Sequence, residues 1–412
     1  MSTLHVWMDG RHIADLSETR GRMSMTYSAD SGPAGRPLIS VSMPAGSTKY
    51  ADAKVRPYFR GLLPEGDARS MIAHDFGLNL GDDMGLLAAL GSDCAGALSI
   101  LPPGRQPTEQ RIDIAESLGR DEIERRLRAL PAAPLGVTGK IRGSLAGMQP
   151  KLLLVRHRDD WSSPADGTPS THIIKPALPR LVNSVENEAF CMRVAMHAGL
   201  DAATTTIERF GRLRALVSRR FDRMIDSGGA VTRIHQEDSC QALSVLIDRV
   251  DQKYQSHGGP SLARIARLLN QWGGSADALL QQVAFNVLVS NADQHGKNVS
   301  FLHQPDGTIR LSPLYDVMCT MYYDGTGELE DVDTELGLHV GSKTEIAEVH
   351  HQDLLDEAKR WGMSEPRARS ILTDLAYRIP AAVDAARSDL PGVPREIIDL
   401  VRARHRTVLS QG

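Results

Sequence analysis

The sequence predicts an α+β fold, in which a β-rich N-terminal part precedes a mostly helical C-terminal part. Two observations support this prediction. Up to about residue 238, many segments between turn signals have the length and composition of strands. After about residue 241 the segments are longer and have the apolar pattern of helices, with one hairpin as the exception.

Residues 1–102 are expected to form an N-terminal unit of strands and short helices. Asp9-Gly10 is a strong hairpin signal, because this dipeptide suits a two-residue turn and apolar runs flank it. The expected strands are 4–8, 12–16, 37–43 and 95–101, and the expected helices are 67–76 and 83–90.

Residues 103–138 are expected to be a linker with one short helix, since proline-rich stretches flank a charged segment at 122–130. Residues 139–238 should form a second unit. Its helix should begin near Asn183 or Ser184, which are good capping residues, and stop at Gly199. Its expected strands are 152–156, 172–175, 204–210 and 213–218.

Residues 239–412 are expected to form a helical C-terminal unit that contains one hairpin. The expected helices are 243–249, 262–272 and 276–289, with several more from about residue 352 to the end. The hairpin should consist of strands 299–303 and 308–311. If its turn is centred on Pro305-Asp306, Val299 faces Ser312.

Composition narrows the class of protein. The 412 residues carry a net charge of −4, which excludes a strongly basic nucleic-acid binder and leaves room only for a local basic patch. No stretch approaches the roughly 18 apolar residues of a membrane span, and the start lacks the pattern of a signal peptide. The four cysteines lie far apart without a CxxC pair, as is typical of a reducing cytosol. We therefore expect a cytoplasmic protein with no membrane contact.

The hairpin is expected to gather three oxygen-bearing side chains. Asn298 comes just before its first strand and Asp316 comes just after its second, so both lie at one end of the hairpin. Asp293 stands five residues before Asn298. Mg²⁺ prefers such hard oxygen ligands, with phosphate and water completing its shell. Asn298 and Asp316 can serve as metal ligands, and Asp293 can take the proton of an acceptor hydroxyl.

The D-x-x-x-x-N spacing of Asp293 and Asn298 equals that in the catalytic loop of protein kinases. Alone it is a weak match, because it occurs by chance in many chains. The alternative is a polar loop in which Asp and Asn cap turns.

A phosphate-binding segment would complete such a site. The glycine-spaced residues 143–151 could offer backbone N–H groups to phosphates, although for this segment taken alone a simple turn is the favoured interpretation. Lys175 ends an apolar strand and would need an anionic partner if buried. Glu188 on the next helix is better aimed at it than Glu186. The alternative is a surface lysine that extends its ammonium into water.

Several motifs together resemble the HipA family, the serine/threonine kinase toxins of bacterial toxin–antitoxin pairs. From residue 144 onward they are SLAGMQPK (144–151), IKP (174–176), SVENE (184–188), RFDR (220–223), QED (236–238), SNADQHGKN (290–298) and YDV (315–317). YFRGLLPEG (58–66) and LGSDCAGA (90–97) resemble the N-terminal region of the family. The resemblance covers nearly the whole chain, and the motifs follow the family order.

The resemblance implies a two-lobed protein-kinase-like fold with an N-terminal β-rich subdomain and an all-helical C-lobe. It also implies roles for individual residues. Asp293 would be the catalytic base, Asn298 and Asp316 would bind Mg²⁺, and Ser144 would be the site of autophosphorylation. The residues expected to bind ATP are Ala146, Gly147, Met148, Gln149, Pro150, Lys151, Lys175, Arg219, Arg220, Phe221, His295, Lys297, Asn298, Tyr315 and Asp316.

The resemblance further implies substrates and partners. The expected protein substrate is an aminoacyl-tRNA synthetase, most often the glutamyl enzyme, whose modification stops translation. The expected partner is a small HipB-like helix-turn-helix antitoxin, which carries the contacts with operator DNA. Two positions depart from the family pattern. Arg219 stands where relatives usually have Glu, and Pro150 removes one N–H donor from the phosphate loop.

Two other functions are compatible with the same residues. One is a non-catalytic nucleotide-binding corepressor of an antitoxin, although a pseudokinase would be expected to lack Asp293 or Asn298. The other is a small-molecule kinase, which would use the same loop chemistry.

Overall fold

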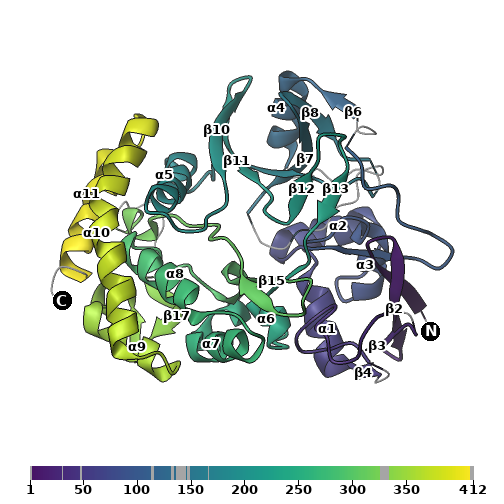
Figure 1. Cartoon of the computed structure of the whole chain (residues 1–412). Helices are drawn as coiled ribbons and strands as arrows, with labels where there is room; N and C mark the ends of the chain where they lie inside the picture. The colour runs from purple at the N-terminus through teal and green to yellow at the C-terminus, as the bar shows by residue number, and fades with distance from the viewer. Residues whose placement is uncertain are drawn as a thin grey trace.

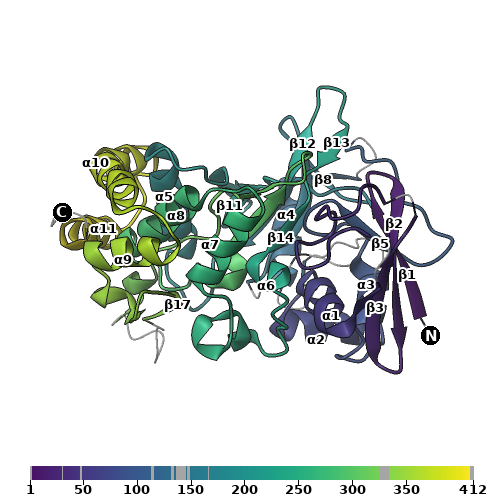
Figure 2. The same cartoon turned by 60° about the horizontal axis from the view of Figure 1, so that its bottom comes forward.

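The structure is a computed structural model, and it describes residues 2–29, 31–46, 49–112, 116–130, 134–135, 145, 149–165, 167–324 and 334–408. Figure 1 shows the N-terminal strands and helices on the right, a second sheet at the top and a helical region on the left. Figure 2 shows the same succession from another side, with β1 and α10 at opposite ends of the molecule. Within the described residues, no helix is both long enough and apolar enough to span a bilayer.

The N-terminal part is an antiparallel sheet packed against three helices. The strands are β1 (Ser2–Met8), β2 (Arg11–Thr19), β3 (Arg22–Tyr27), β4 (Tyr50–Ala51) and β5 (Leu98–Leu101), in the order β4-β3-β2-β1-β5. The helices are α1 (Asp52–Gly61), α2 (Gly66–Asp75) and α3 (Asp83–Leu90). The predicted hairpin is confirmed: Met8 pairs with Arg11, and Asp9 and Gly10 both adopt positive φ, as a type I′ turn requires.

The strand predicted at 37–43 does not form. In this segment Ser40 and Met43 make only an isolated bridge. The reason is that side chains satisfy its backbone: the N–H of Val41 donates to the Glu237 carboxylate and the N–H of Ile39 donates to the Tyr27 hydroxyl.

The second sheet has six strands in the order β10-β11-β9-β7-β8-β6. They are β6 (Glu116–Leu118), β7 (Leu152–His157), β8 (Asp160–Ser163), β9 (His172–Pro176), β10 (Thr205–Phe210) and β11 (Leu213–Arg219). Helix α4 (Arg120–Ala129) shares an apolar cluster with this sheet, and α5 (Ser184–His197) packs on β10 and β11. A small hairpin of β12 (Arg223–Ile225) and β13 (Val231–Arg233) follows. Helix α5 begins at Ser184 as predicted.

The C-terminal part surrounds a core of helices. These are α6 (Ser239–Ala242), α7 (Leu262–Gln271), α8 (Ala276–Leu288), α9 (His351–Arg360), α10 (Glu365–Asp389) and α11 (Arg395–Val408). The strands are β14 (Gln236–Asp238), β15 (Ser300–His303), β16 (Ile309–Leu311), β17 (Glu335–Val340) and β18 (Lys343–Glu345). The one-turn 3-10 helices are η1 (Val250–Lys253), η2 (Gln255–His257), η3 (Gly296–Asn298), η4 (Thr320–Tyr322) and η5 (Ile346–Glu348). Buried side chains of α5 and α7–α11 form one continuous core.

The helix predicted at 243–249 is absent. Helix α6 stops at Ala242 because Ser244 adopts a left-handed φ of 54° and the N–H of Val245 donates to the carbonyl of Cys240. This bond closes a Schellman motif, which ends a helix.

The β15–β16 hairpin forms, but its register differs by one residue from the prediction. Ser300, and not Val299, lies opposite Ser312, since Phe301 pairs with Leu311. The cause is Gly307, whose φ of 90° adds a left-handed residue to the turn. The hairpin still brings the residues before β15 and after β16 to the same end. The predicted unit boundaries at residues 102, 138 and 238 stay predictions.

Candidate active site

A cavity of about 470 Å³ lies where the three parts of the chain meet. Its walls contain most of the candidate residues: Gln149, Lys151, Lys175, Arg219, Arg220, Phe221, Asp293, His295, Lys297, Asn298, Tyr315 and Asp316. Pro150 is described but is not among the lining residues. Ser144, Ala146, Gly147 and Met148 lie outside the described residues. Gly61, Leu62 and Glu65 of the N-terminal part also line the cavity.

Lys175 near the end of β9 forms ion pairs with two carboxylates. Its Nζ lies 2.8 Å from Oε1 of Glu188 on α5 and 2.6 Å from Oδ1 of Asp316. The preference for Glu188 over Glu186 is therefore confirmed, and Glu186 instead pairs with Arg214. Burial disfavours the charged form of Asp316, but the Lys175 ammonium outweighs burial and lowers the pKa of Asp316 to about 2. Asp316 is thus an anion at neutral pH.

Lys151 supplies a second positive charge to the cavity. Leu152 pairs with Ile174, so the ladder of β7 and β9 places Lys151 across from Lys175. Burial, and then the positive charge of Lys175, lower the pKa of Lys151 to about 8. Two cations facing one cavity form a site suited to an anionic ligand such as a polyphosphate.

The loop after α8 holds Asp293 and Asn298 in place. Helix α8 is terminated by Ser290, which has a left-handed φ of 57°, and by a bond from the N–H of Asn291 to the carbonyl of Asn286. The Nδ2 of Asn298 donates to the backbone carbonyl of Asp293 at 3.2 Å. Because the amide nitrogen is engaged in this bond, the amide oxygen is the atom that can bind a cation. Asp293 itself is exposed on the cavity wall.

Asp316 adopts a left-handed φ of 59°. This conformation is uncommon for residues other than glycine, and such residues concentrate at functional sites. One cavity is thus lined by Asn298, Asp293 and Asp316. The Asn298 amide oxygen and the Asp316 carboxylate could bind a divalent cation, and Asp293 adds a second carboxylate to the same cavity. This donor set fits Mg²⁺.

Aromatic and histidine side chains form another part of the wall. The ring centroids of Phe221 and Tyr315 lie 5.6 Å apart, and the Tyr315 hydroxyl donates to the carbonyl of Lys297. Burial lowers the pKa of His295 well below its usual value, so this ring is neutral. Its Nδ1 has no hydrogen-bond partner among the described residues, which leaves the atom available to a ligand.

Two of the candidate residues direct their charged groups to protein partners. The Lys297 ammonium lies 2.8 Å from Asp238 and 3.4 Å from Glu65. The Arg220 guanidinium is buried and donates to Asp222 and Ser170. Any contact of Arg220 with a nucleotide would therefore come from its backbone.

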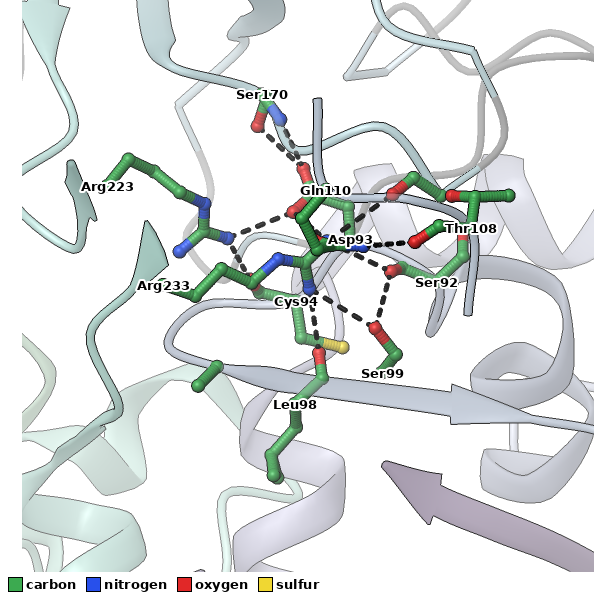
Figure 3. A network of polar contacts seen from close by, with 12 residues as sticks. Ser92, Asp93, Cys94, Leu98, Ser99, Thr108, Gln110, Ser170, Arg223 and Arg233 are labelled. Atoms are coloured by element: carbon green, nitrogen blue, oxygen red, sulfur yellow. Dashed lines mark hydrogen bonds and ion pairs between the residues drawn. The ribbon is translucent and has the colours of Figure 1, made fainter. Parts of the chain in front are cut away.

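Arg220 belongs to a buried charge network that joins the N-terminal part to the second sheet. Figure 3 shows its centre, where Asp93 accepts hydrogen bonds from Ser170 and pairs with Arg223 at 2.9 Å and Arg233 at 3.4 Å. Burial disfavours the charged form of Asp93, but the positive charges of Arg220, Arg223 and Arg233 outweigh burial and lower the pKa of Asp93 to about 2. The sequence prediction did not include this network, because its charges come from segments far apart in the chain.

The sequence prediction also missed Tyr254, Lys253 and Glu65 as wall residues. Tyr254 is the most consequential, because its hydroxyl donates to Oδ1 of Asp293 at 2.6 Å. No local motif marks these residues. Glu65 lies within the YFRGLLPEG segment, which was noted only as a family resemblance.

Comparison with known proteins supports these observations. Residues 143–383 match the model of the HipA-like C-terminal domain, and residues 4–101 match that of the HipA N-terminal domain. The chain is 36% identical to the protein Y4mE of Sinorhizobium fredii, over 98% of this chain and 95% of that protein. It is 30% identical to the serine/threonine-protein kinase toxin HipA of Shewanella oneidensis, over 99% of this chain and 94% of that one.

A solved structure shares the fold. HipA of Shewanella oneidensis, in a complex with HipB and its operator DNA, superimposes with a TM-score of 0.82 at 27% identity. The match covers 99% of this chain and 96% of that one. The predicted α+β, two-lobed fold with a β-rich N-terminal subdomain is thereby confirmed.

Proposed function

The chain belongs to the HipA family, and from this premise we propose that it is an ATP- and Mg²⁺-dependent serine/threonine protein kinase that acts as a toxin. The relative from Shewanella oneidensis carries that kinase and toxin name. The observation that carries the proposal is the single cavity lined by Asp293, Asn298, Asp316 and Lys175. A phosphoryl transfer needs a base, two metal ligands and a phosphate-binding cation, and these residues supply them.

ATP would bind with its phosphates toward the two lysines. Lys175 and Lys151 would contact the phosphate oxygens, and Asn298 and Asp316 would hold Mg²⁺. The cation, when bound, would neutralise charge on the phosphates. Residues 219–221 and Tyr315 would lie beside the adenine, with Phe221 and Tyr315 offering apolar ring surface.

Asp293 would orient the acceptor. The acceptor hydroxyl would donate to the carboxylate, and its oxygen would form a bond with the γ-phosphorus as the bond from that phosphorus to the leaving ADP oxygen breaks. The hydroxyl proton would move to Asp293.

The proposed protein substrate is an aminoacyl-tRNA synthetase, with the glutamyl enzyme first among them, whose modification would stop translation. Because aminoacyl-tRNA synthetases act in the cytoplasm, the proposed location of the kinase is also the cytoplasm. A HipB-like antitoxin is the proposed partner, supported by the complex of HipA with HipB and operator DNA in Shewanella oneidensis. Ser144 is the proposed site of autophosphorylation. In the proposed phosphate-binding segment, a phosphate on Ser144 would add about −1.5 to −2 charges, and its repulsion of the ATP phosphates would inactivate the enzyme.

The direct test is phosphate transfer from labelled ATP to proteins of a bacterial lysate. Wild-type protein should label an acceptor, and Asp293→Ala should reduce the labelling by at least about 100-fold, the usual contribution of a positioned base. Asp159→Ala is the matched control, because the Asp159 side chain is fully exposed on the β7–β8 turn. Equal labelling by wild type and Asp293→Ala would refute the proposal.

A further inference from the structure

The segment between α6 and α7 brings a tyrosine into the cavity. Lys253 and Tyr254 both line the cavity wall, at the junction of η1 and η2. The Tyr254 ring meets the His295 ring edge-on at 5.2 Å, and the Lys253 Nζ lies 5.4 Å from the Tyr254 ring centroid. These contacts aim the phenol at the catalytic loop.

The Tyr254 hydroxyl donates to Oδ1 of Asp293 at 2.6 Å. An acceptor hydroxyl that is about to receive a phosphoryl group must make this same bond, because Asp293 is the proposed proton acceptor. A carboxylate oxygen that accepts a short bond from a phenol is less available to a second donor. Tyr254 and an acceptor side chain therefore compete for Asp293.

We propose that Tyr254 is an acceptor-site residue: its hydroxyl occupies the place of the acceptor hydroxyl on Asp293, and a protein substrate must displace it before transfer. This inference rests on the proposed kinase function. Tyr254 would then select among protein substrates. Only a substrate segment that binds firmly enough to displace the Tyr254 hydroxyl would reach Asp293.

The segment that carries Tyr254 is anchored on both sides of the tyrosine. Asp248 pairs with Arg60 of α1 at 3.1 Å, and the Gln255 side chain accepts a bond from the N–H of His339 in β17. The carbonyl of Tyr254 accepts bonds from the N–H groups of His257 and Gly259. With the backbone held in this way, rotation of the half-buried Tyr254 side chain would break its bond to Asp293 without moving the chain.

Tyr254→Phe tests the inference, because it removes the hydroxyl and keeps the ring contacts with His295 and Lys253. The probe is dephosphorylated casein, a generic serine-rich acceptor, at saturating ATP and Mg²⁺. The KM for casein should fall by about tenfold, the effect expected for losing a competing hydrogen bond to a charged group. The KM for ATP should change by less than about twofold. Hydrolysis of ATP without an acceptor should rise, since water gains access to Asp293.

Tyr50→Phe is the matched control. It also loses one hydroxyl bond, to the carbonyl of Pro44 in the N-terminal part, and should leave both KM values unchanged. An unchanged casein KM in Tyr254→Phe, or a fall in kcat alone, would overturn the inference, because the hydroxyl would then merely support Asp293. Phosphate found on Tyr254 would also overturn it, since the phenol would be a substrate. Failure of the kinase proposal is recognised separately, by equal casein labelling with wild type and Asp293→Ala.

Discussion

The two lysines of the cavity differ in pKa because their neighbours differ. Lys175 contacts two carboxylates, and although burial opposes its charge, Asp316 and Glu188 raise its pKa. Lys151 lies across from that ammonium, and burial together with this repulsion lowers its pKa to about 8. Lys175 therefore stays charged well above neutral pH, whereas Lys151 titrates near pH 8.

Binding of a nucleotide should depend on the charge of Lys151. Below pH 8 the ammonium is charged and attracts a triphosphate, and above it the amine is neutral. The affinity for a non-hydrolysable ATP analogue, measured by calorimetry, should fall by about tenfold between about pH 7 and about pH 9.

Lys151→Arg should abolish this pH dependence, because a guanidinium stays charged throughout. Lys151→Met should bind weakly at both pH values. Lys54→Arg on α1 is the control, because the Lys54 ammonium donates to the carbonyl of Ser42 and lies over the Tyr50 ring, and Lys54 does not line the cavity. Parallel pH profiles for wild type and Lys151→Arg would show that another group titrates.

At the residue scale, sequence reasoning reached the side chains that lie on one local motif or at a helical spacing. The pairing of Lys175 with Glu188 followed from the position of Glu188 on the face of α5. The contact of Tyr254 with Asp293 did not, because their 39-residue separation contains no periodic relation.

At the scale of elements, the long helices and strands β7, β9, β10 and β11 were predictable because their apolar patterns agree with their burial, whereas strands β6 and β8 of the same sheet were missed. Two predicted elements are absent because a tertiary contact or an unusual backbone dihedral determines the local structure. The strand predicted at 37–43 is replaced by contacts such as the bond from the Val41 N–H to Glu237. The helix predicted at 243–249 is absent because the left-handed Ser244 ends α6. Helix α1 was missed; it contains Pro57, which is normally unfavourable inside a helix. Strand β3 was missed although its alternating buried residues carry a period of two.

Gly307 sets the register of the β15–β16 hairpin, and its replacement should cost stability. An alanine at a φ of 90° is strained, and its Cβ would lie 3.3 Å from the Arg36 side chain. Gly307→Ala should lower the free energy of unfolding in urea by about 1 kcal/mol.

Gly46→Ala is the control for that measurement, because a Cβ at Gly46 meets open space and its φ is not positive. Because the carboxylates lie beyond the turn, Gly307→Ala should retain phosphate transfer to casein. A stability equal to that of Gly46→Ala would show that the left-handed conformation does not determine the hairpin register.

At the scale of the whole molecule, the N-terminal part contributes to the cavity and is tied to the rest by buried polar groups. Glu237 accepts bonds from the Ser40 hydroxyl and the Val41 N–H, and Lys297 in the loop after α8 pairs with Glu65. The composition indicated separate units along the chain, but no sequence pattern revealed these contacts. Buried charges that pair across segments more than a hundred residues apart leave no local signal.

The network around Asp93 should account for a large share of this coupling. Three guanidinium groups, of Arg220, Arg223 and Arg233, surround the carboxylates of Asp93 and Asp222, so Asp93→Asn leaves excess positive charge buried. The free energy of unfolding in urea at neutral pH should fall by about 3 kcal/mol. Asp159→Asn, at a fully exposed carboxylate, should change it by less than about 0.5 kcal/mol.

The difference between wild type and Asp93→Asn should shrink as the solution becomes acidic. The pKa of Asp93 is about 2 in the folded protein, below the roughly 3.9 of an unfolded aspartate. A depressed folded pKa means that the stabilisation is complete above about pH 4 and is lost as pH falls toward 2. Unfolding curves at neutral pH and at about pH 3 measure this change. A difference that stays constant over that range would show that Asp93 acts through its shape and hydrogen bonds with Ser170, and not through its charge.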